Sequence, residues 1–168
     1  CHRDNQIRRR TPEDMKGFRI WAGVLMGLCL LLYAAVSEAA DLPVTSPFGW
    51  RVHPISGTWK FHSGVDLGYE YGTVVPALFD GTVVEEGDFS DGYGNHVTLY
   101  HQDYDTYTKY CHLSAIYVET GQYVQQGEEI GAVGSTGYST GPHLHLEYIV
   151  RNPDTGEYEY TDPLSLWQ

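Results

Sequence analysis

Basic residues are scarce in this 168-residue sequence, which has 10 Lys and Arg against 22 Asp and Glu and a formal net charge of −12. Residues 1–40 carry six of the basic residues and four of the acidic ones, a net +2, which leaves −14 on residues 41–168. Nucleic-acid binding needs clustered cations that displace the counterions of the phosphate backbone. The later region holds only four cations, so nucleic-acid binding is excluded: Arg51, Lys60, Lys109 and Arg151.

Cysteine is also scarce, at three residues. Cys1, Cys29 and Cys111 are too few and too widely separated for a disulfide framework. Cys111 is the only cysteine after residue 40, so we expect no disulfide within the folded region. Its side chain is expected to act as a small buried apolar group.

One long apolar run is present, over residues 17–36, with Lys16 and Arg19 near its N-terminal end. Basic residues, an apolar segment and then small residues at positions 37, 39 and 40 are the pattern of a secretory signal peptide. The run is also long enough to span a bilayer if it is retained. We therefore expect residues 15–40 to be a signal peptide or an N-terminal anchor, and an uncleaved leader to be the only membrane contact.

The first 14 residues are polar and precede Met15. We expect residues 1–14 to be a non-native upstream extension and Met15 to be the natural start. A chain of this length has room for one domain with a real core. The folded domain is therefore predicted to cover residues 41–168, with its oligomeric state open.

Helical periodicity is absent from residue 42 onwards, where short alternating or β-branched runs are separated by Gly, Asn and Asp turns. This pattern predicts an all-β domain, a β-sandwich or hybrid barrel of mostly antiparallel strands. One helical turn is expected at residues 115–119. The predicted strands cover residues 74–77, 81–86, 96–101, 106–113, 129–134 and 143–151.

Two histidines stand two residues apart at the start of the last predicted strand, His143 and His145. Alternate residues of a strand share a face, so both imidazoles point to one side while the intervening leucine packs on the other. Glu147 continues this polar face. A metal can be shared by two such histidines, or one can bind it while the other acts on water or substrate.

A second pattern is His62-x-x-x-Asp66. In a fully extended segment these side chains would lie about 13 Å apart, too far to reach one zinc ion at about 2 Å. The segment must therefore bend, and Gly64 is the residue that permits a bend or an unusual φ.

Further candidates come from the segment 108–112, where strand alternation predicts that Tyr110 and His112 share the metal face. Two imidazoles and one carboxylate suit zinc and leave one position of a tetrahedral site for water. A nearby histidine can supply the proton transfers that hydrolysis needs.

These motifs resemble those of the lysostaphin/LytM-type zinc metallopeptidases, whose known members cut peptide cross-links of bacterial peptidoglycan. The resemblance runs in the family's order through essentially the whole of residues 41–168. Besides the motifs above it includes the segments 46–51, 53–54, 72–73, 80–81, 92–95, 121–124, 127, 130–131 and 136–147.

The resemblance implies that His62, Asp66 and His145 bind Zn²⁺ in a groove and that His112 and His143 are catalytic. It implies a zinc-dependent endopeptidase that hydrolyses peptidoglycan stem or cross-bridge peptides. It also implies a place beyond the bacterial inner membrane, in the periplasm, the cell wall or the medium. The sequence leaves open whether a glycine bridge or a meso-diaminopimelate cross-link is cut.

The remaining histidines have weaker claims to function. His53 and His101 are expected to make structural hydrogen bonds, and His96 is expected at the surface. Among the tyrosines, Tyr110 and Tyr138 are the ones we expect in the groove, because each flanks a catalytic motif.

Two alternatives stay open. One is a non-catalytic module of the same fold that binds the cell wall or an envelope partner. The other is a carrier or phosphotransfer domain, suggested by an internal echo between residues 72–84 and 121–133 that resembles the hammerhead turns of biotinyl/lipoyl-type barrels.

Overall fold

The computed structural model describes residues 42–52 and 56–167. The predicted leader, the upstream extension and His53 lie outside the described residues. Within the described part, no helix is both long enough and apolar enough to cross a membrane.

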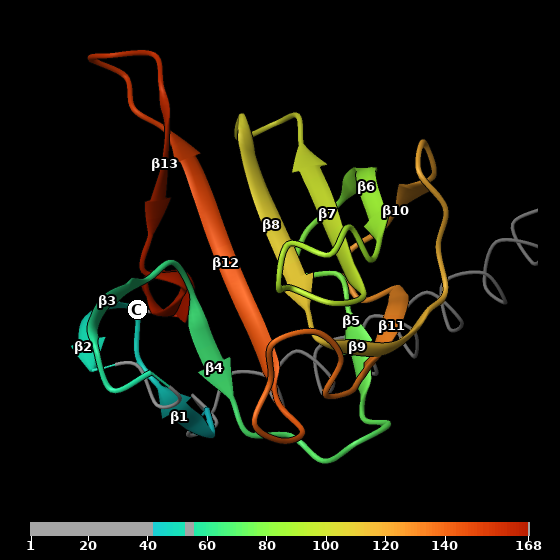
Figure 1. The fold of residues 1–168 in the computed structure, drawn as a ribbon. Helices are drawn as coiled ribbons and strands as arrows, with labels where there is room; N and C mark the ends of the chain where they lie inside the picture. The colour runs from blue at the N-terminus through green and yellow to red at the C-terminus, as the bar shows by residue number, and fades with distance from the viewer. Residues whose placement is uncertain (1–41, 53–55, 168) are drawn as a thin grey trace, which may run out of the picture. The chain divides into compact units, whose positions relative to one another are not determined.

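Antiparallel strands make up nearly all of the described secondary structure (Figure 1). The largest sheet has eight strands in the order β1-β4-β12-β8-β7-β6-β10, and β13 pairs with β12. Its strands are β1 (Val44–Ser46), β4 (Val65–Leu67), β6 (Gly81–Gly87), β7 (His96–His101), β8 (Thr106–Cys111), β10 (Tyr123–Val124), β12 (Leu144–Arg151) and β13 (Tyr158–Thr161).

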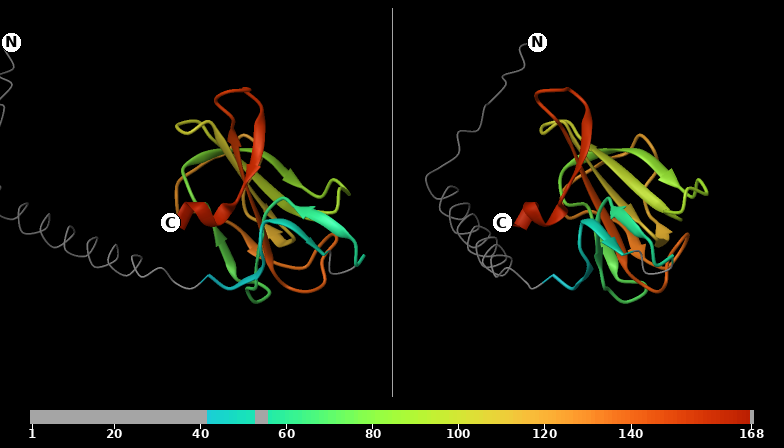
Figure 2. Two further views of the ribbon diagram at one scale, coloured as in Figure 1. Left: turned by 90° about the vertical axis from the view of Figure 1, so that its left-hand side faces the viewer. Right: turned by 60° about the vertical axis from the view of Figure 1, so that its left-hand side comes forward.

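Two smaller sheets complete the domain. One has the order β5-β11-β9 and the other is a β2-β3 hairpin. Figure 2 shows the β12–β13 hairpin projecting from the body of the domain. The remaining elements are β2 (Gly49–Val52), β3 (Trp59–His62), β5 (Val74–Pro76), β9 (Leu113–Ile116), β11 (Glu129–Val133) and a 3₁₀ helix, η1 (Pro163–Trp167).

In the β4-β12-β8 region of the large sheet, one face packs into the hydrophobic core and the other carries polar side chains. Leu146 pairs with Val65 on β4 and with Tyr110 on β8, and all three side chains are buried in the hydrophobic core. Burial of one large apolar side chain stabilises a fold by about 1.5–3 kcal/mol. The neighbouring residue His145 pairs with Asp66 and points to the opposite face. The row that contains Val65 and Leu146 therefore stabilises the sheet, and the adjacent row presents Asp66 and His145 on the polar face.

The predicted all-β fold is confirmed, and each of the six predicted strands has a counterpart. Two details differ. The strand predicted over residues 106–113 is interrupted at His112, whose φ of 62° lies in the left-handed region. The predicted helical turn at residues 115–119 is wrong, because Leu113–Ile116 pair with β11 as strand β9.

The internal echo corresponds to a reciprocal arrangement of backbone hydrogen bonds. The amide of Gly72 donates to the carbonyl of Val133, and the amide of Gly121 donates to the carbonyl of Val83, each at 2.8 Å. Each half of the repeat is thus closed by the end of the other half, which fits the hybrid-barrel description.

Candidate metal centre

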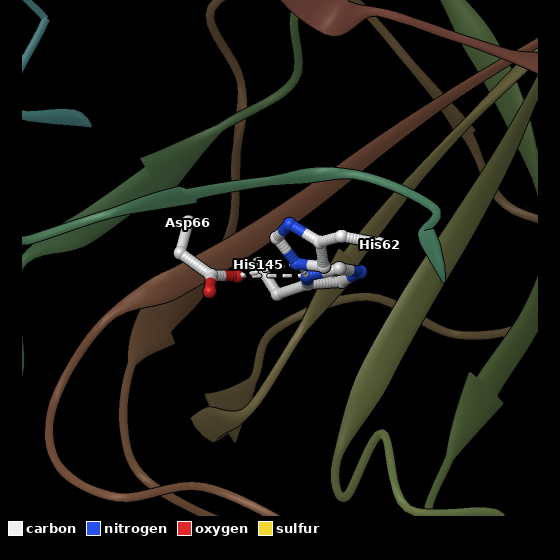
Figure 3. A group of neighbouring side chains, drawn as sticks. All are labelled: His62, Asp66 and His145. Carbon is white, nitrogen blue, oxygen red and sulfur yellow. Dashed lines mark hydrogen bonds and ion pairs between the residues drawn. The ribbon is translucent and has the colours of Figure 1, made fainter. Parts of the chain in front are cut away.

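Three side chains from three strands converge on the polar face of the sheet. His62 is the last residue of β3, Asp66 is the middle residue of β4, and His145 lies opposite Asp66 on β12. His62 Nε2 lies 3.1 Å from Asp66 Oδ1 and 3.0 Å from His145 Nδ1, and the latter is 2.8 Å from Asp66 Oδ1. Figure 3 shows the three groups pointing toward one another. The candidate ligand atoms all lie within 4.8 Å of one another.

Gly64 makes this convergence possible, although not through an unusual φ. The chain bends between β3 and β4 as predicted, yet Gly64 is not among the residues with positive φ. A Cβ atom at this position would instead lie 2.3 Å from the carbonyl oxygen of Leu146 and 2.9 Å from Cε1 of His145. A side chain here would therefore push the turn away from β12 and separate the three groups.

In His62 and His145, a hydrogen bond to one ring nitrogen determines which nitrogen is left to face the cluster. His62 Nδ1 lies 2.8 Å from the carbonyl oxygen of Pro47 and donates to it. His145 Nε2 lies 3.3 Å from Glu147 Oε1 and donates to that carboxylate. Outer-shell partners of this kind fix the tautomer and orientation of a metal-binding imidazole. His62 therefore presents Nε2, whereas His145 presents Nδ1.

Glu147 is fully buried behind His145. Its Oε1 accepts hydrogen bonds from the hydroxyl groups of Ser63 and Tyr93 as well as from His145. Burial acts to raise the pKa of this carboxyl, but these donors, His145 foremost, bring it below the ordinary value. The strand alternation predicted that Glu147 lies on the polar face, but no role was assigned to it. The feature that could have identified its role is its position two residues after His145 in the same strand.

The charges at the cluster require a cation. Burial would raise the pKa of Asp66, but hydrogen bonds from His145 and His62 hold it well below its usual range. Burial also acts to lower the pKa of His145, yet the carboxylates of Asp66 and Glu147 raise it. The guanidinium of Arg51 lies 3.6 Å from Asp66 Oδ2, and a proton on His145 or a metal ion would add the further positive charge that balances both carboxylates. Two imidazoles and a carboxylate are a donor set that zinc accepts, so the residues fit a metal site.

His112 and His143 lie beside this cluster, with ring centroids 4.7 Å apart. The Nδ1–H of His112 donates to the carbonyl of Thr136 and that of His143 to the carbonyl of Gly141, each at 2.8 Å. His143 Nε2 lies 3.7 Å from Asp66 Oδ1. Burial lowers the pKa of His112 to about 4. Both rings thus keep Nε2 for the site, and His112 is neutral at pH 7.

The left-handed φ of His112 corrects the predicted alternation in segment 108–112. Tyr110 does not share a face with His112, and the prediction that Tyr110 lines the groove is wrong. Its ring is in the core, and its hydroxyl accepts hydrogen bonds from the amide of Leu78 and the hydroxyl of Thr108. Tyr138, by contrast, lines the cleft as predicted.

The cluster of His62, Asp66 and His145 lines a cleft of about 580 Å³. Its walls come from the β2-β3 hairpin and from the loops that precede β7 and β12. The cleft is lined by Arg51, Lys60, Phe61, His62, Ser63, Asp66, Ser90, Asp91, Gly92, Tyr93, His112, Tyr138, Ser139, Thr140, His143 and His145.

Three further sequence predictions concern buried groups outside the cleft. The surface position predicted for His96 is wrong, because its side chain is fully buried and bonds the carbonyl of Gly94 and the carboxylate of Glu85. The structural role predicted for His101 is confirmed by its bonds to the Asp80 carbonyl and the Thr108 hydroxyl. The prediction for Cys111 is confirmed: the thiol is buried, and burial raises its pKa.

Residues 60–158 match the model of Peptidase family M23. The chain belongs to this family. The fold agrees: 77% of the chain superposes on 94% of the catalytic domain of lysostaphin from Staphylococcus simulans, with a TM-score of 0.66 and 35% identity. The resemblance to lysostaphin/LytM-type peptidases is therefore confirmed, and the carrier or phosphotransfer alternative is excluded.

Curated relatives agree with this assignment. The chain is 49% identical over 104 residues to the DD-carboxypeptidase/endopeptidase Mpg of Neisseria meningitidis, covering 62% of the chain and 24% of that protein. It is 42% identical over 120 residues to the peptidoglycan DD-endopeptidase ShyC of Vibrio cholerae, covering 68% and 27%. The chain thus spans about a quarter of the length of these relatives.

Proposed function

We propose that residues 41–168 form a zinc-dependent endopeptidase that hydrolyses peptide bonds in peptidoglycan stem or cross-bridge peptides. The observation that carries the proposal is the convergence of His62 Nε2, Asp66 Oδ1 and His145 Nδ1 within 4.8 Å in the lining of a cleft. These three residues would hold the metal. Zinc, when bound, lowers the pKa of water toward neutrality and polarises a carbonyl group.

His112 and His143 are the groups that would move protons. Each imidazole has its Nδ1–H fixed on a backbone carbonyl, so each offers Nε2 to the cleft. His112 is neutral at pH 7 because burial lowers its pKa to about 4, and a neutral imidazole can accept a proton at Nε2. His143 Nε2 lies 3.7 Å from Asp66 Oδ1. Because the Nδ1–H of His143 is already committed to the Gly141 carbonyl, this ring can donate from Nε2 only after that nitrogen has taken up a proton. His112 would accept a proton at Nε2, and His143, once protonated there, would donate a hydrogen bond to an oxyanion in the cleft.

The substrate follows from the relatives, whose names describe peptidases acting on peptidoglycan. Such a substrate lies beyond the inner membrane, in the periplasm, the cell wall or the medium. The basic, apolar and small-residue order of residues 15–40 supplies an export signal or anchor that is consistent with this place.

Release of muropeptides from purified sacculi tests the proposal. Residues 41–168 would be incubated with sacculi with and without Zn²⁺, beside the variants His145→Ala and His112→Ala. We expect release of uncross-linked peptides that requires zinc and both histidines. His145→Ala should also lower zinc affinity by more than about 100-fold, since even outer-shell changes reach that value.

Mass spectrometry of the released peptides would identify the bond. A zinc-loaded domain that binds sacculi from several wall types and releases nothing would refute the hydrolase and establish the binding-module alternative. Equal release by wild type and His145→Ala would contradict the assigned metal ligand.

A further inference from the structure

Two cations face each other on the wall of the metal cleft. Arg51 of β2 and Lys60 of β3 are direct cross-strand partners in the hairpin, and both line the cleft. Residues directly opposite in an antiparallel pair project from the same face. Their register places them on the face that carries His62, whereas Trp50 and its partner Phe61 belong to the other face.

This pairing is unfavourable unless something balances it. Like charges directly opposite each other destabilise a β-ladder. Nε of Arg51 is buried and has no hydrogen-bond partner, and one terminal nitrogen of its guanidinium lies 3.6 Å from Asp66 Oδ2. Among residues 42–52 and 56–167, no carboxylate forms an ion pair with Lys60. Lys60 therefore presents uncompensated positive charge to the cleft, and Arg51 shares the carboxylate of Asp66 with His62 and His145.

The position of these cations is informative because cations are rare. Residues 41–168 hold four Lys and Arg against a net charge of −14, and two of the four line this cleft. The other two have carboxylate partners elsewhere: Lys109 pairs with Glu85 and Arg151 with Asp105. A domain this acidic does not need cations in its cleft for solubility. The presence of Arg51 and Lys60 there therefore favours a role in binding an anion.

The carboxylates of the cleft do not fill that role. Asp66 belongs to the metal cluster, where two imidazoles share its Oδ1. Asp91 also lines the cleft, but its Oδ1 accepts a hydrogen bond from the amide of Tyr93 in its own loop. An additional carboxylate is needed to use the free donors of Arg51 and Lys60. A guanidinium matches a carboxylate with two parallel N–H bonds, and an ammonium adds a point charge.

We propose that Arg51 and Lys60 form a carboxylate subsite for the peptide substrate beside the metal. The inference rests on the proposed function and specifies its substrate. The preferred peptide carries a free carboxylate near the scissile bond, as a meso-diaminopimelate cross-link does, and an uncharged glycine bridge lacks this contact. The subsite sets specificity through substrate binding, while bond cleavage depends on the metal cluster and its histidines.

Two synthetic cross-linked peptides test the subsite, identical except that one carries a free carboxylate beside the scissile bond and the other its carboxamide. The zinc-loaded wild-type domain should show a kcat/KM about 10-fold higher for the carboxylate, as expected for charge-assisted hydrogen bonds. Lys60→Met should reduce this preference mainly by raising KM for the carboxylate. Lys60→Glu should reverse the preference toward the carboxamide.

Arg151→Gln is the matched control, because it removes one positive charge from an exposed position paired with Asp105. It should keep the wild-type preference. Equal cleavage of both peptides by the wild type would overturn the subsite while leaving the peptidase intact. An equal loss on both peptides in Lys60→Met would also overturn it. Failure to cleave either peptide or any sacculus would remove the proposed function, and the subsite with it.

Discussion

Two groups of histidines lie in different parts of the domain, and burial alone does not distinguish them, because His112 is buried as His96 and His101 are. On β7, His96 and His101 have both ring nitrogens bonded within the protein. In the cleft, His112 and His143 have Nδ1 fixed by a backbone carbonyl and Nε2 left for the site. Among these four histidines, the two with both nitrogens bonded support the fold, whereas the two with only Nδ1 fixed keep Nε2 toward the cleft.

The two metal-site histidines extend this comparison. A neutral carbonyl, that of Pro47, holds His62, but a buried carboxylate, that of Glu147, holds His145. A carboxylate acceptor makes the imidazole a stronger ligand than a carbonyl does. We therefore predict that the two proposed ligands, which look alike in the sequence, differ in strength.

The largest expected difference between the two groups is in turnover. His112→Ala and His143→Ala should each lower kcat by about 10²–10⁴-fold, the usual contribution of general acid–base catalysis. Zinc content should stay near one ion per chain, because neither residue is in the metal cluster. Steady-state kinetics with metal analysis would check both. Loss of zinc together with activity would contradict a purely catalytic role.

The second-largest expected difference is in zinc affinity, and it concerns the carboxylates that hold His145 and His96. Glu147→Gln should lower zinc affinity by about 10–100-fold, the usual range for an outer-shell partner, because the neutral amide leaves His145 a weaker ligand. Glu85→Gln is the matched control, since Glu85 holds Nε2 of the structural His96. It should leave zinc affinity unchanged. Competition with a chromophoric chelator measures both values, and equal affinities for all three proteins would refute the positioning role of Glu147.

Substitution of a structural histidine should lower stability without changing zinc affinity or turnover. His101→Ala leaves the Thr108 hydroxyl and the Asp80 carbonyl without their imidazole partner, which should cost about 1–3 kcal/mol of unfolding free energy. Zinc affinity and kcat of the folded protein should not change. Urea unfolding of the metal-free domain gives the stability. A variant that keeps wild-type stability but loses zinc would reverse the assignment of His101.

The smallest expected effect is the acid sensitivity that His101 confers. Burial lowers its pKa below the ordinary histidine value of about 6.5, so below that pH the unfolded chain binds a proton that the folded domain resists. Stability from this group is present above about pH 6.5 and is lost as the pH falls toward the lowered pKa. His101→Gln should flatten the slope by at most about 1.4 kcal/mol per pH unit. An unchanged slope in urea titrations between pH 7 and 5 would contradict it.

Much of the fold was predictable because the long strands carry their own pattern. Residues 144 and 146 alternate with His145 and Glu147, so the sequence itself separates the core row from the site row. The short strands β1 to β4 were not predicted. Segments of three or four residues do not show a period, and these strands are held by pairing with β12 and with each other.

The candidate site was recognisable from its residue types and spacing, but its supports were not. The hydrogen bonds that the imidazoles donate to the backbone carbonyls of Pro47, Thr136 and Gly141 cannot be read from a pattern of side chains. The reason for Gly64 also lies outside its own segment, since the atoms that exclude a side chain belong to β12. His96 was misplaced because Glu85, its partner from β6, becomes visible only in three dimensions.

The buried thiol of Cys111 gives the domain a built-in probe of its own opening. Cys111 lies opposite His145 in the β8–β12 pair, and it is the one cysteine of residues 41–168. An alkylating reagent can reach it only when these strands separate, so the modification rate follows the population of the opened state. Any ion held by His145 lowers that population by mass action. Alkylation slowed in proportion to added metal would thus report occupancy of the centre without any substrate.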